Sequence, residues 1–336
     1  MTEFEKGFSY GFIIGSGQGG GGGGTVIKEK EVPWKYPDHW KSLPNAKSGE
    51  IYLLAYPTTA NNTIKLSAVC SENQRYMPSG YGVSVNWDYG GSGSSDIQYT
   101  FSAQSMTMSH KYTNVNKQHV IKITAPSSTT ADGANMAFIQ ISSAASSNNF
   151  LAVCAGEDTF AFNYIGSFNV VYAKIMHKDI NATTTDNSFS DYIGGGLKGQ
   201  YRHLIRNLIG ESTTNNCRRI DFAGYPTSWA SNGDGILNGT HLRCVYGLEK
   251  LTNYDNTSFF ENAVMNKISL DSITKFTMNS FRNSDIMEVY APKCTEFGEN
   301  AFLNCTQLKR LTVKKGCTVP DYISTNNPML EIRFEE

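Results

Sequence analysis

Apolar positions recur with a regular spacing in the last third of the chain. Each unit carries three of them, at positions i, i+3 and i+5, and the first unit is Cys217, Ile220 and Phe222. The later units are Leu242, Val245 and Gly247; Met265, Ile268 and Leu270; Ile286, Val289 and Ala291; Leu308, Leu311 and Val313; and Met329, Ile332 and Phe334. Successive units begin 25, 23, 21, 22 and 21 residues apart, which is the range of leucine-rich repeats. A coil of that length cannot bury its own apolar side, so the pattern predicts coils stacked on one another.

Further columns keep the same period. Phe260, Phe281 and Phe302 are each followed two residues later by an asparagine. These asparagines are Asn262, Asn283 and Asn304. Another column, 21 residues apart, is formed by the pair Ile273 and Phe276 and the pair Cys294 and Phe297. Several columns with one period favour a solenoid over chance spacing.

The residues just before the middle apolar positions predict a ladder of charges. In stacked parallel strands they lie about 4.8 Å apart, and here they are Lys267, Glu288, Arg310 and Glu331. Alternating signs stabilise each neighbouring pair by roughly 0.2 to 1 kcal/mol, by analogy with cross-strand pairs. A register slipped by one residue would lose this pattern.

These units resemble the BspA-type leucine-rich repeats of bacterial and phage surface proteins. That family has an "aF-x-x-C-x-x-L" pattern, and residues 217 to 334 carry the resemblance. Ala301, Phe302, Cys305 and Leu308 match it well, and Ser280, Phe281 and Ile286 match it less closely. The resemblance implies a solenoid used in adhesion or recognition, without specifying the ligand.

Between Glu50 and about Ile175 the chain consists of short β-forming runs separated by Gly, Ser, Asn and Asp. Apolar and polar residues alternate within runs such as "VSVNW" and "VIKIT", and successive runs are spaced by roughly ten residues. This pattern is typical of an antiparallel sandwich or barrel. One part of this region, about 80 to 125, resembles a PKD-like Ig sandwich. The matching positions are Val83, Val85, Trp87, Gly90, His110, Tyr112, Val120 and Ile123. This resemblance implies a spacer or binding module.

An apolar stripe begins the chain, made of Phe4, Phe8, Phe12, Ile13 and Ile14. A helix this short is marginal alone, so the stripe predicts an anchor that binds another protein. The glycine-rich run that follows predicts a flexible linker. Gly15, Gly17 and Gly20 also fit G-x-G-x-x-G, but no helix or suitably placed acidic residue follows, which disfavours nucleotide binding. The charged start and interrupted apolar run are unlike a signal peptide.

Two segments are expected to cover neighbouring domains. "VPWKYPDHWKSLP", residues 32 to 44, places two tryptophans among three prolines. It is expected to cover the edge of the next domain, with docking on another surface as the alternative. Leu204, Ile205, Leu208 and Ile209 have helical spacing and predict an N-terminal cap on the solenoid.

Composition and motifs limit the partners and activities expected of this chain. A net charge of −1 with 18% charged residues offers no basic field for nucleic acid. Seven cysteines without a C-x-x-C pair are expected to be free, buried thiols, and no apolar run is long enough to span a membrane. No catalytic motif is present, so no enzyme activity, cofactor or metal is expected. Asp88 and Asp96 lie beside a Gly-rich turn, so a calcium site there is an alternative. The paired carboxylates of a glycosidase have no sequence signature, so the sequence does not exclude them.

The fold class expected is therefore mainly β, with one or two Ig-like antiparallel sandwiches and a C-terminal leucine-rich-repeat solenoid. The expected segments are an apolar anchor at 1–16, a Gly-rich linker at 17–31, a PKD/Ig-like sandwich at 32–125, a second β-rich region and linker at 126–200, and a capped solenoid at 201–336.

This organisation suggests a tailed-phage virion protein, a fibre or appendage that attaches to the host. The expected partners are other virion proteins at the N-terminus, a host glycan or protein at the repeats, and further copies of the chain. The candidate receptor face is Tyr246, Lys267, Glu288, Tyr290 and Arg310, because aromatic and Arg side chains often carry binding energy. The alternatives are a BspA-type bacterial adhesin, a polysaccharide-degrading appendage, and a structural virion spacer without a receptor.

Overall fold

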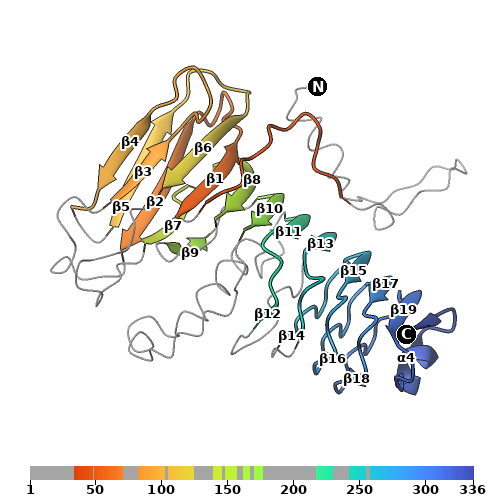
Figure 1. Cartoon of the computed structure of the whole chain (residues 1–336). Coiled ribbons are helices and arrows are strands. Elements are labelled where there is room, and N and C mark those ends of the chain that lie inside the picture. The colour runs from red at the N-terminus through yellow and green to blue at the C-terminus, as the bar shows by residue number, and fades with distance from the viewer. Residues whose placement is uncertain are drawn as a thin grey trace, which may run out of the picture.

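The computed structural model describes residues 34–47, 49–70, 82–102, 105–124, 139–145, 148–156, 162–166, 170–176, 217–229, 242–254 and 258–336. The expected anchor, the glycine linker and the helical cap at Leu204–Ile209 lie outside these residues. Within them the chain is mainly β, with one short helix, α4 (Asp321–Asn326). Figure 1 shows two layers of strands that lead into a row of short stacked strands.

One eight-stranded sheet runs through both parts of the molecule. Its order is β13-β11-β10-β8-β1-β6-β3-β4. The strands are β13 (Cys244–Tyr246), β11 (Arg219–Phe222), β10 (Tyr172–Ile175), β8 (Phe150–Ala155), β1 (Glu50–Ala55), β6 (His119–Thr124), β3 (Gly82–Asn86) and β4 (Asp96–Thr100). Pairing is antiparallel from β4 to β8, and parallel from β8 through β10 and β11 to β13.

A second, four-stranded sheet contributes to the same core as the first. Its order is β5-β2-β7-β9, comprising β5 (Ser105–Lys111), β2 (Thr63–Cys70), β7 (Ile139–Ser143) and β9 (Phe162–Gly166). Ile51 and Leu53 of β1 share a buried core with Ile64 and Leu66 of β2. The expected β-rich region is therefore a pair of sheets, while its assignment as PKD/Ig-like stays a prediction.

The domain boundary expected at residue 125 does not coincide with a break in the structure. β8 pairs with β1, and β7 pairs with β2, so residues after 125 complete the sheets begun before it. The sequence pattern could not show this, because strand partners far apart in the chain are chosen by tertiary packing.

Residues 34–47, here called the strap, cover the outer face of the eight-stranded sheet. Trp40 and Ala46 are buried against Tyr52, Leu54 and Leu151. Accordingly β1 and β8 are buried along their whole length, as expected for strands covered on both faces rather than on one. The strap thus covers part of the neighbouring domain, and it does so across a face of the sheet.

The strap is held by hydrogen bonds as well as by aromatic packing. The Lys41 N–H donates to Gln118 Oε1 (2.6 Å), and Gln118 Nε2 donates to the His39 carbonyl (3.0 Å). Lys174 Nζ donates to Asn45 Oδ1 (2.6 Å), which ties the strap to β10. The strap therefore contacts both parts of the continuous sheet.

The C-terminal residues form the predicted solenoid. A parallel sheet of order β15-β17-β19-β20 follows β13, made of β15 (Lys267–Ser269), β17 (Glu288–Tyr290), β19 (Arg310–Lys314) and β20 (Glu331–Glu335). Ile268 lies opposite Val289, and Val289 opposite Leu311, and all three are buried. The apolar columns therefore point inward in the predicted register.

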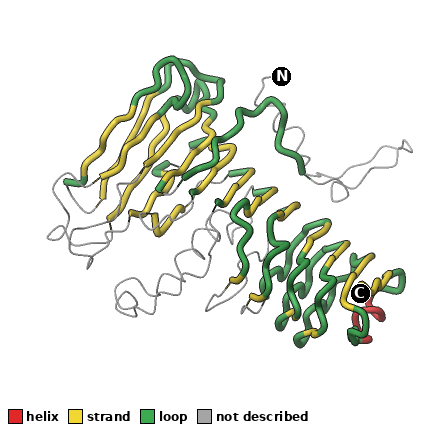
Figure 2. Tube along the Cα trace, viewed as in Figure 1, coloured by secondary structure: helices red, strands yellow, loops and turns green. Residues whose placement is uncertain are grey.

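Short strands mark the other side of each coil. They are β12 (Ser228–Trp229) paired with β14 (Asn253–Tyr254), and β16 (Lys275–Phe276) paired with β18 (Glu296–Phe297). Figure 2 shows that loops and turns join these strands along most of the solenoid.

Phenylalanine and asparagine shape the turns for different physical reasons. Phe281 stacks on Phe260 and on Phe302, with ring centroids 4.8 and 5.0 Å apart, so these side chains form a continuous buried column. The asparagines two residues later, Asn262, Asn283 and Asn304, have φ of 58°, 59° and 62°, a left-handed conformation that asparagine tolerates better than most residues. The Asn column is thus a backbone requirement.

The solenoid begins earlier than expected. Val170, Ala173 and Ile175 have the same i, i+3, i+5 spacing, and Ala173 pairs with Ile220 of the next coil. All three are buried in the common core. The parallel stack thus includes β10, which precedes the start expected at residue 201 and is laid directly on β8 of the paired sheets.

Gly247 occupies an apolar column position for a steric reason. Its φ is +87°, and a Cβ there would lie 2.1 Å from the Phe222 carbonyl oxygen of the preceding coil. Only glycine combines this conformation with so close a backbone approach.

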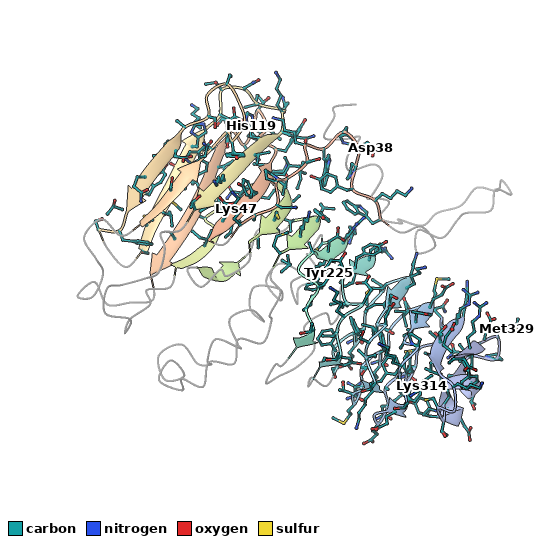
Figure 3. The ribbon with its side chains drawn as sticks, in the orientation of Figure 1. Asp38, Lys47, His119, Tyr225, Lys314 and Met329 are labelled. Carbon is teal, nitrogen blue, oxygen red and sulfur yellow. The ribbon has the colours of Figure 1, made fainter. Side chains whose placement is uncertain are left out.

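The last coil departs from the predicted pattern. Met329 is 88% exposed and Phe334 is 53% exposed, whereas Leu330 packs against the core in a partly buried position. The expected burial of Met329 and Phe334 is therefore wrong. This coil is at the edge of the described sheet, and among the described residues no other coil packs on its outer side. Figure 3 shows Met329 at this end of the molecule and His119 at the other.

Candidate recognition face

Each strand of the solenoid turns two side chains away from the core. The first column contains Tyr172, Arg219, Cys244, Lys267, Glu288, Arg310 and Glu331, and the second contains Lys174, Asp221, Tyr246, Ser269, Tyr290, Thr312 and Arg333. Because strand side chains alternate, both columns lie on the side opposite Ile268, Val289 and Leu311. Together they form the outer face.

The strap covers the first part of this outer face. The Trp34 ring stacks on the Tyr172 ring, with centroids 6.2 Å apart, and the backbone N–H of Trp34 donates to Cys244 Sγ of β13 (3.2 Å). Within the described residues, strap contacts extend as far as β13, whereas the outward side chains of β15, β17, β19 and β20 are not covered by the strap. We call this second part the open face.

The open face is hollowed around Tyr290. A depression of about 230 Å³ is lined by Lys267, Ile268, Ser269, Glu288, Val289, Tyr290, Arg310, Thr312, Arg333 and Glu335. Tyr290 is 40% exposed, so its ring offers an aromatic surface inside a polar surround.

Ion pairs hold the charged side chains of the open face in place. Arg310 Nη1 lies 3.0 Å from Glu288 Oε1, and Arg310 Nε lies 3.1 Å from Glu331 Oε2. Arg333 Nε lies 2.8 Å from Glu331 Oε1. Hydrogen bonds from Arg333 and Arg310 hold the pKa of Glu331 below its ordinary value. The alternating register predicted for Lys267, Glu288, Arg310 and Glu331 is confirmed by the strand pairing.

Tyr246 marks the border between the strap and the open face. It is 41% exposed, and the guanidinium carbon of Arg219 lies 4.5 Å from the centre of its ring. Arg219 is itself fixed by two bonds to Asp221, of 2.7 and 2.8 Å, and Tyr172 Oη donates to the same carboxylate at 2.8 Å. Burial first, then the nearby Asp221, raise the pKa of Tyr172, so its hydroxyl stays protonated as a donor.

All five residues of the candidate receptor face lie on the outer face of the solenoid. Lys267, Glu288, Tyr290 and Arg310 line the depression, while Tyr246 lies at its border with the strap. Four further residues line the depression that the sequence pattern did not single out: Ser269, Thr312, Arg333 and Glu335. Each follows a ladder position by two or four residues and so shares its face. The pattern did not single out the Tyr172–Arg219–Asp221 cluster either, because β10 was not recognised as part of the repeat.

The acidic residues proposed as a calcium alternative are engaged elsewhere. Asp88 Oδ1 lies 3.0 Å from His119 Nδ1, and Asp96 Oδ1 accepts a hydrogen bond from Asn86 Nδ2 at 2.9 Å. Among the described residues, no three His, Cys, Asp or Glu side chains are grouped so that they could hold a metal ion.

Six cysteines in the described part of the chain are buried and form no disulfide bond there: Cys154, Cys217, Cys244, Cys294, Cys305 and Cys317. Burial raises the pKa of Cys217 and Cys294 to about 12 and that of Cys305 to about 11. These thiols are therefore protonated at neutral pH and serve as small apolar side chains, as expected.

No helix in the described part of the chain has the length and apolar character needed to cross a membrane.

Comparison with protein families identifies the repeat. Residues 206–321 match the family model described as "BspA type Leucine rich repeat region", in six copies. The resemblance noted in the sequence is confirmed for this part of the chain, and the paired sheets before it are not included in the match. No curated protein and no solved structure matches the chain.

Proposed function

We propose that this protein is a non-enzymatic recognition protein whose solenoid binds a ligand on the surface of a cell through the open face. The observation that carries the proposal is the combination of an exposed Tyr290 and a depression lined by positioned Arg, Lys and Glu side chains. Tyr and Arg are enriched among residues that dominate binding energy. The BspA-type match supports this use, because that repeat is associated with surface adhesion and recognition.

Within that function, we place the protein on a tailed-phage virion, as a fibre or appendage that contacts the host. The apolar stripe at Phe4, Phe8, Phe12, Ile13 and Ile14 would bind other virion proteins, and the glycine run would let the remainder swivel. Several copies on one particle would turn weak contacts into firm attachment through avidity. A BspA-type adhesin on a bacterial surface fits the family match equally well.

A purely structural spacer is the second candidate. One observation favours it: Glu288, Arg310, Glu331 and Arg333 are already paired with one another, so they stabilise the coil stack even without a ligand. The spacer and the recognition protein differ in whether the open face affects attachment.

Attachment can be tested by competition. Purified protein added in excess should block adsorption of particles, or of bacteria carrying the protein, to their target cells. Tyr290→Ala should lose this competition by about tenfold or more, as expected for an aromatic hot spot. Tyr89→Ala is a matched control, because Tyr89 is 38% exposed and lies between β3 and β4 at a distance from the solenoid. Equal competition by both variants would favour the spacer.

Whether the protein is part of a virion or of a bacterial surface can be tested separately. Mass spectrometry of purified virions should detect the chain, and deletion of residues 1–16 should prevent its incorporation while circular dichroism of the purified variant stays unchanged. Detection in a cell-wall fraction with none in virions would replace the virion by the bacterial surface.

A further inference from the structure

Resting on the proposed function, we propose that the outer face of the solenoid binds an extended, uncharged polysaccharide that lies along the solenoid axis, with one sugar ring on Tyr246 and another on Tyr290. The ligand class follows from the aromatic spacing, the charge balance of the lining and the shortage of other apolar side chains. Each of these observations is independent of the others.

The two tyrosines are spaced as a pair of sugar platforms. Tyr246 is the last residue of β13 and Tyr290 the last of β17; Ser269 is the last of β15, which pairs with β17 and contacts β13. Neighbouring strands of such a stack lie about 4.8 Å apart, so the two tyrosine positions are about 10 Å apart along the axis. That length corresponds to two pyranose rings of an extended chain, so alternate sugars meet an aromatic ring while the sugar between them passes over the small Ser269.

Both tyrosine side chains are partly exposed to solvent. Tyr246 is 41% and Tyr290 is 40% exposed. Arg219 lies over one ring, that of Tyr246, and is itself fixed by Asp221, so this platform is held in position before a ligand arrives. A platform ordered in advance costs less entropy on binding.

The basic charges of the lining are nearly matched by acidic ones. The depression is lined by Lys267, Arg310 and Arg333 together with Glu288 and Glu335. Glu331, beside the depression, pairs with both arginines, and Arg310 also pairs with Glu288. A polyanion would have to lie against the carboxylates and break those pairs. Hydroxyl groups, in contrast, accept from the guanidinium groups and donate to the carboxylates, so an uncharged polyol uses both kinds of partner.

A protein partner fits the open face less well. The centre of a protein interface is depleted of charged residues and enriched in apolar ones. On the open face Tyr290 is the large exposed apolar side chain amid charged neighbours, and the Met329 and Phe334 side chains lie at the terminal coil. A polar face with isolated aromatic rings favours carbohydrate.

The strap sets the limit of the binding surface at one end. Trp34 reaches Cys244 and stacks on Tyr172, so it occupies the outer face immediately before Tyr246. A polysaccharide therefore extends from Tyr246 toward β20 and not toward the paired sheets.

Affinity electrophoresis of the full chain tests this proposal. The gels would contain neutral polysaccharides (hydroxyethylcellulose, mannan, galactan and mixed-linkage glucan) or acidic ones (carboxymethylcellulose, polygalacturonate and heparin). We expect at least one neutral polysaccharide to retard the protein. Tyr246→Ala and Tyr290→Ala should each weaken the retardation by about tenfold, while Tyr89→Ala leaves it unchanged.

Binding of the retarding polysaccharide should also be tested by calorimetry in about 1 M salt, where the Debye length is only about 3 Å. We expect little loss of affinity, and tetrasaccharide fragments should bind at least about tenfold more tightly than disaccharides, because only the longer ones span both rings. Circular dichroism of each variant establishes that it is folded.

Retardation by acidic polysaccharides alone, absence of retardation by the whole panel, or equal binding by the tyrosine variants would overturn the proposal. The adsorption competition described above separates this failure from that of the proposed function. If Tyr290→Ala abolishes competition although no neutral polysaccharide binds, recognition stands and the ligand class is wrong.

Discussion

Ala173 of β10 lies directly opposite Ile220 of β11, although 47 residues separate them in the chain. This pairing joins the sheet of the N-terminal half to the first coils of the solenoid. The buried core is likewise continuous from Ile51 to Ile323. β8 therefore covers the edge of the first parallel strand, β10, that would otherwise be exposed.

This shared sheet predicts that the two halves unfold together. Differential scanning calorimetry of the full chain should give a single transition, since neither half can lose its structure without exposing the core of the other. Ala173→Asp places an unpaired charge in the junction and should lower the free energy of unfolding by about 4 kcal/mol or more. Two well-separated transitions in the unaltered protein would contradict the shared core.

The buried side chain of Leu311 should contribute strongly to the stability of the solenoid. It is fully buried between Val289 and Ile332, so Leu311→Ala should cost about 2 to 5 kcal/mol in urea unfolding. Lys314→Ala, on the exposed end of the same strand, should change stability by less than about 0.5 kcal/mol. Similar losses in both variants would contradict a buried Leu311 and an exposed Lys314 on the same strand.

The strap should stabilise the sheet on which it lies. Trp40 is buried against Tyr52 and Leu54, so Trp40→Ala should lower stability by about 3 to 5 kcal/mol and reduce hydrogen-exchange protection in β1 and β8. Lys35→Ala, at an exposed position of the same segment, is the control. Unchanged protection in β1 after Trp40→Ala would show that the strap is dispensable.

Glu50 predicts a loss of stability in acid. Its burial acts to raise its pKa, but hydrogen bonds from Lys122 and from the Lys47 N–H outweigh this and leave the pKa below the ordinary value of 4.5. The folded state therefore binds this proton less readily than the unfolded state, so the contribution is present above about pH 4.5 and is lost as the pH falls below it.

Removing the ion pair between Lys122 and Glu50 tests whether Glu50 causes this loss of stability in acid. Lys122 Nζ lies 2.8 Å from Glu50 Oε1. Urea unfolding of Lys122→Met between about pH 7 and pH 3 should give a shallower fall in stability than the unaltered protein. A slope equal to that of the unaltered protein would assign the acid effect to other groups.

The sequence by itself determined the solenoid and the direction of its side chains. Ile268, Val289 and Leu311 lie in register because a coil of about 21 residues can bury its apolar side only against an identical neighbour. The same register placed Lys267, Glu288, Tyr290 and Arg310 on one face, since strand side chains alternate. The match to BspA-type repeats agrees with this local, periodic information.

Only the tertiary structure decided where the solenoid begins and how much of its outer face is open. Ala173 was not recognised as part of the repeat because the chain between β10 and β11 interrupts the period, and nothing local links the two strands. The strap likewise reaches β13 through Trp34 and Cys244, which are 210 residues apart. Such contacts depend on apolar surfaces that exist only after distant segments have folded, so the alternation of polar and apolar positions cannot predict them.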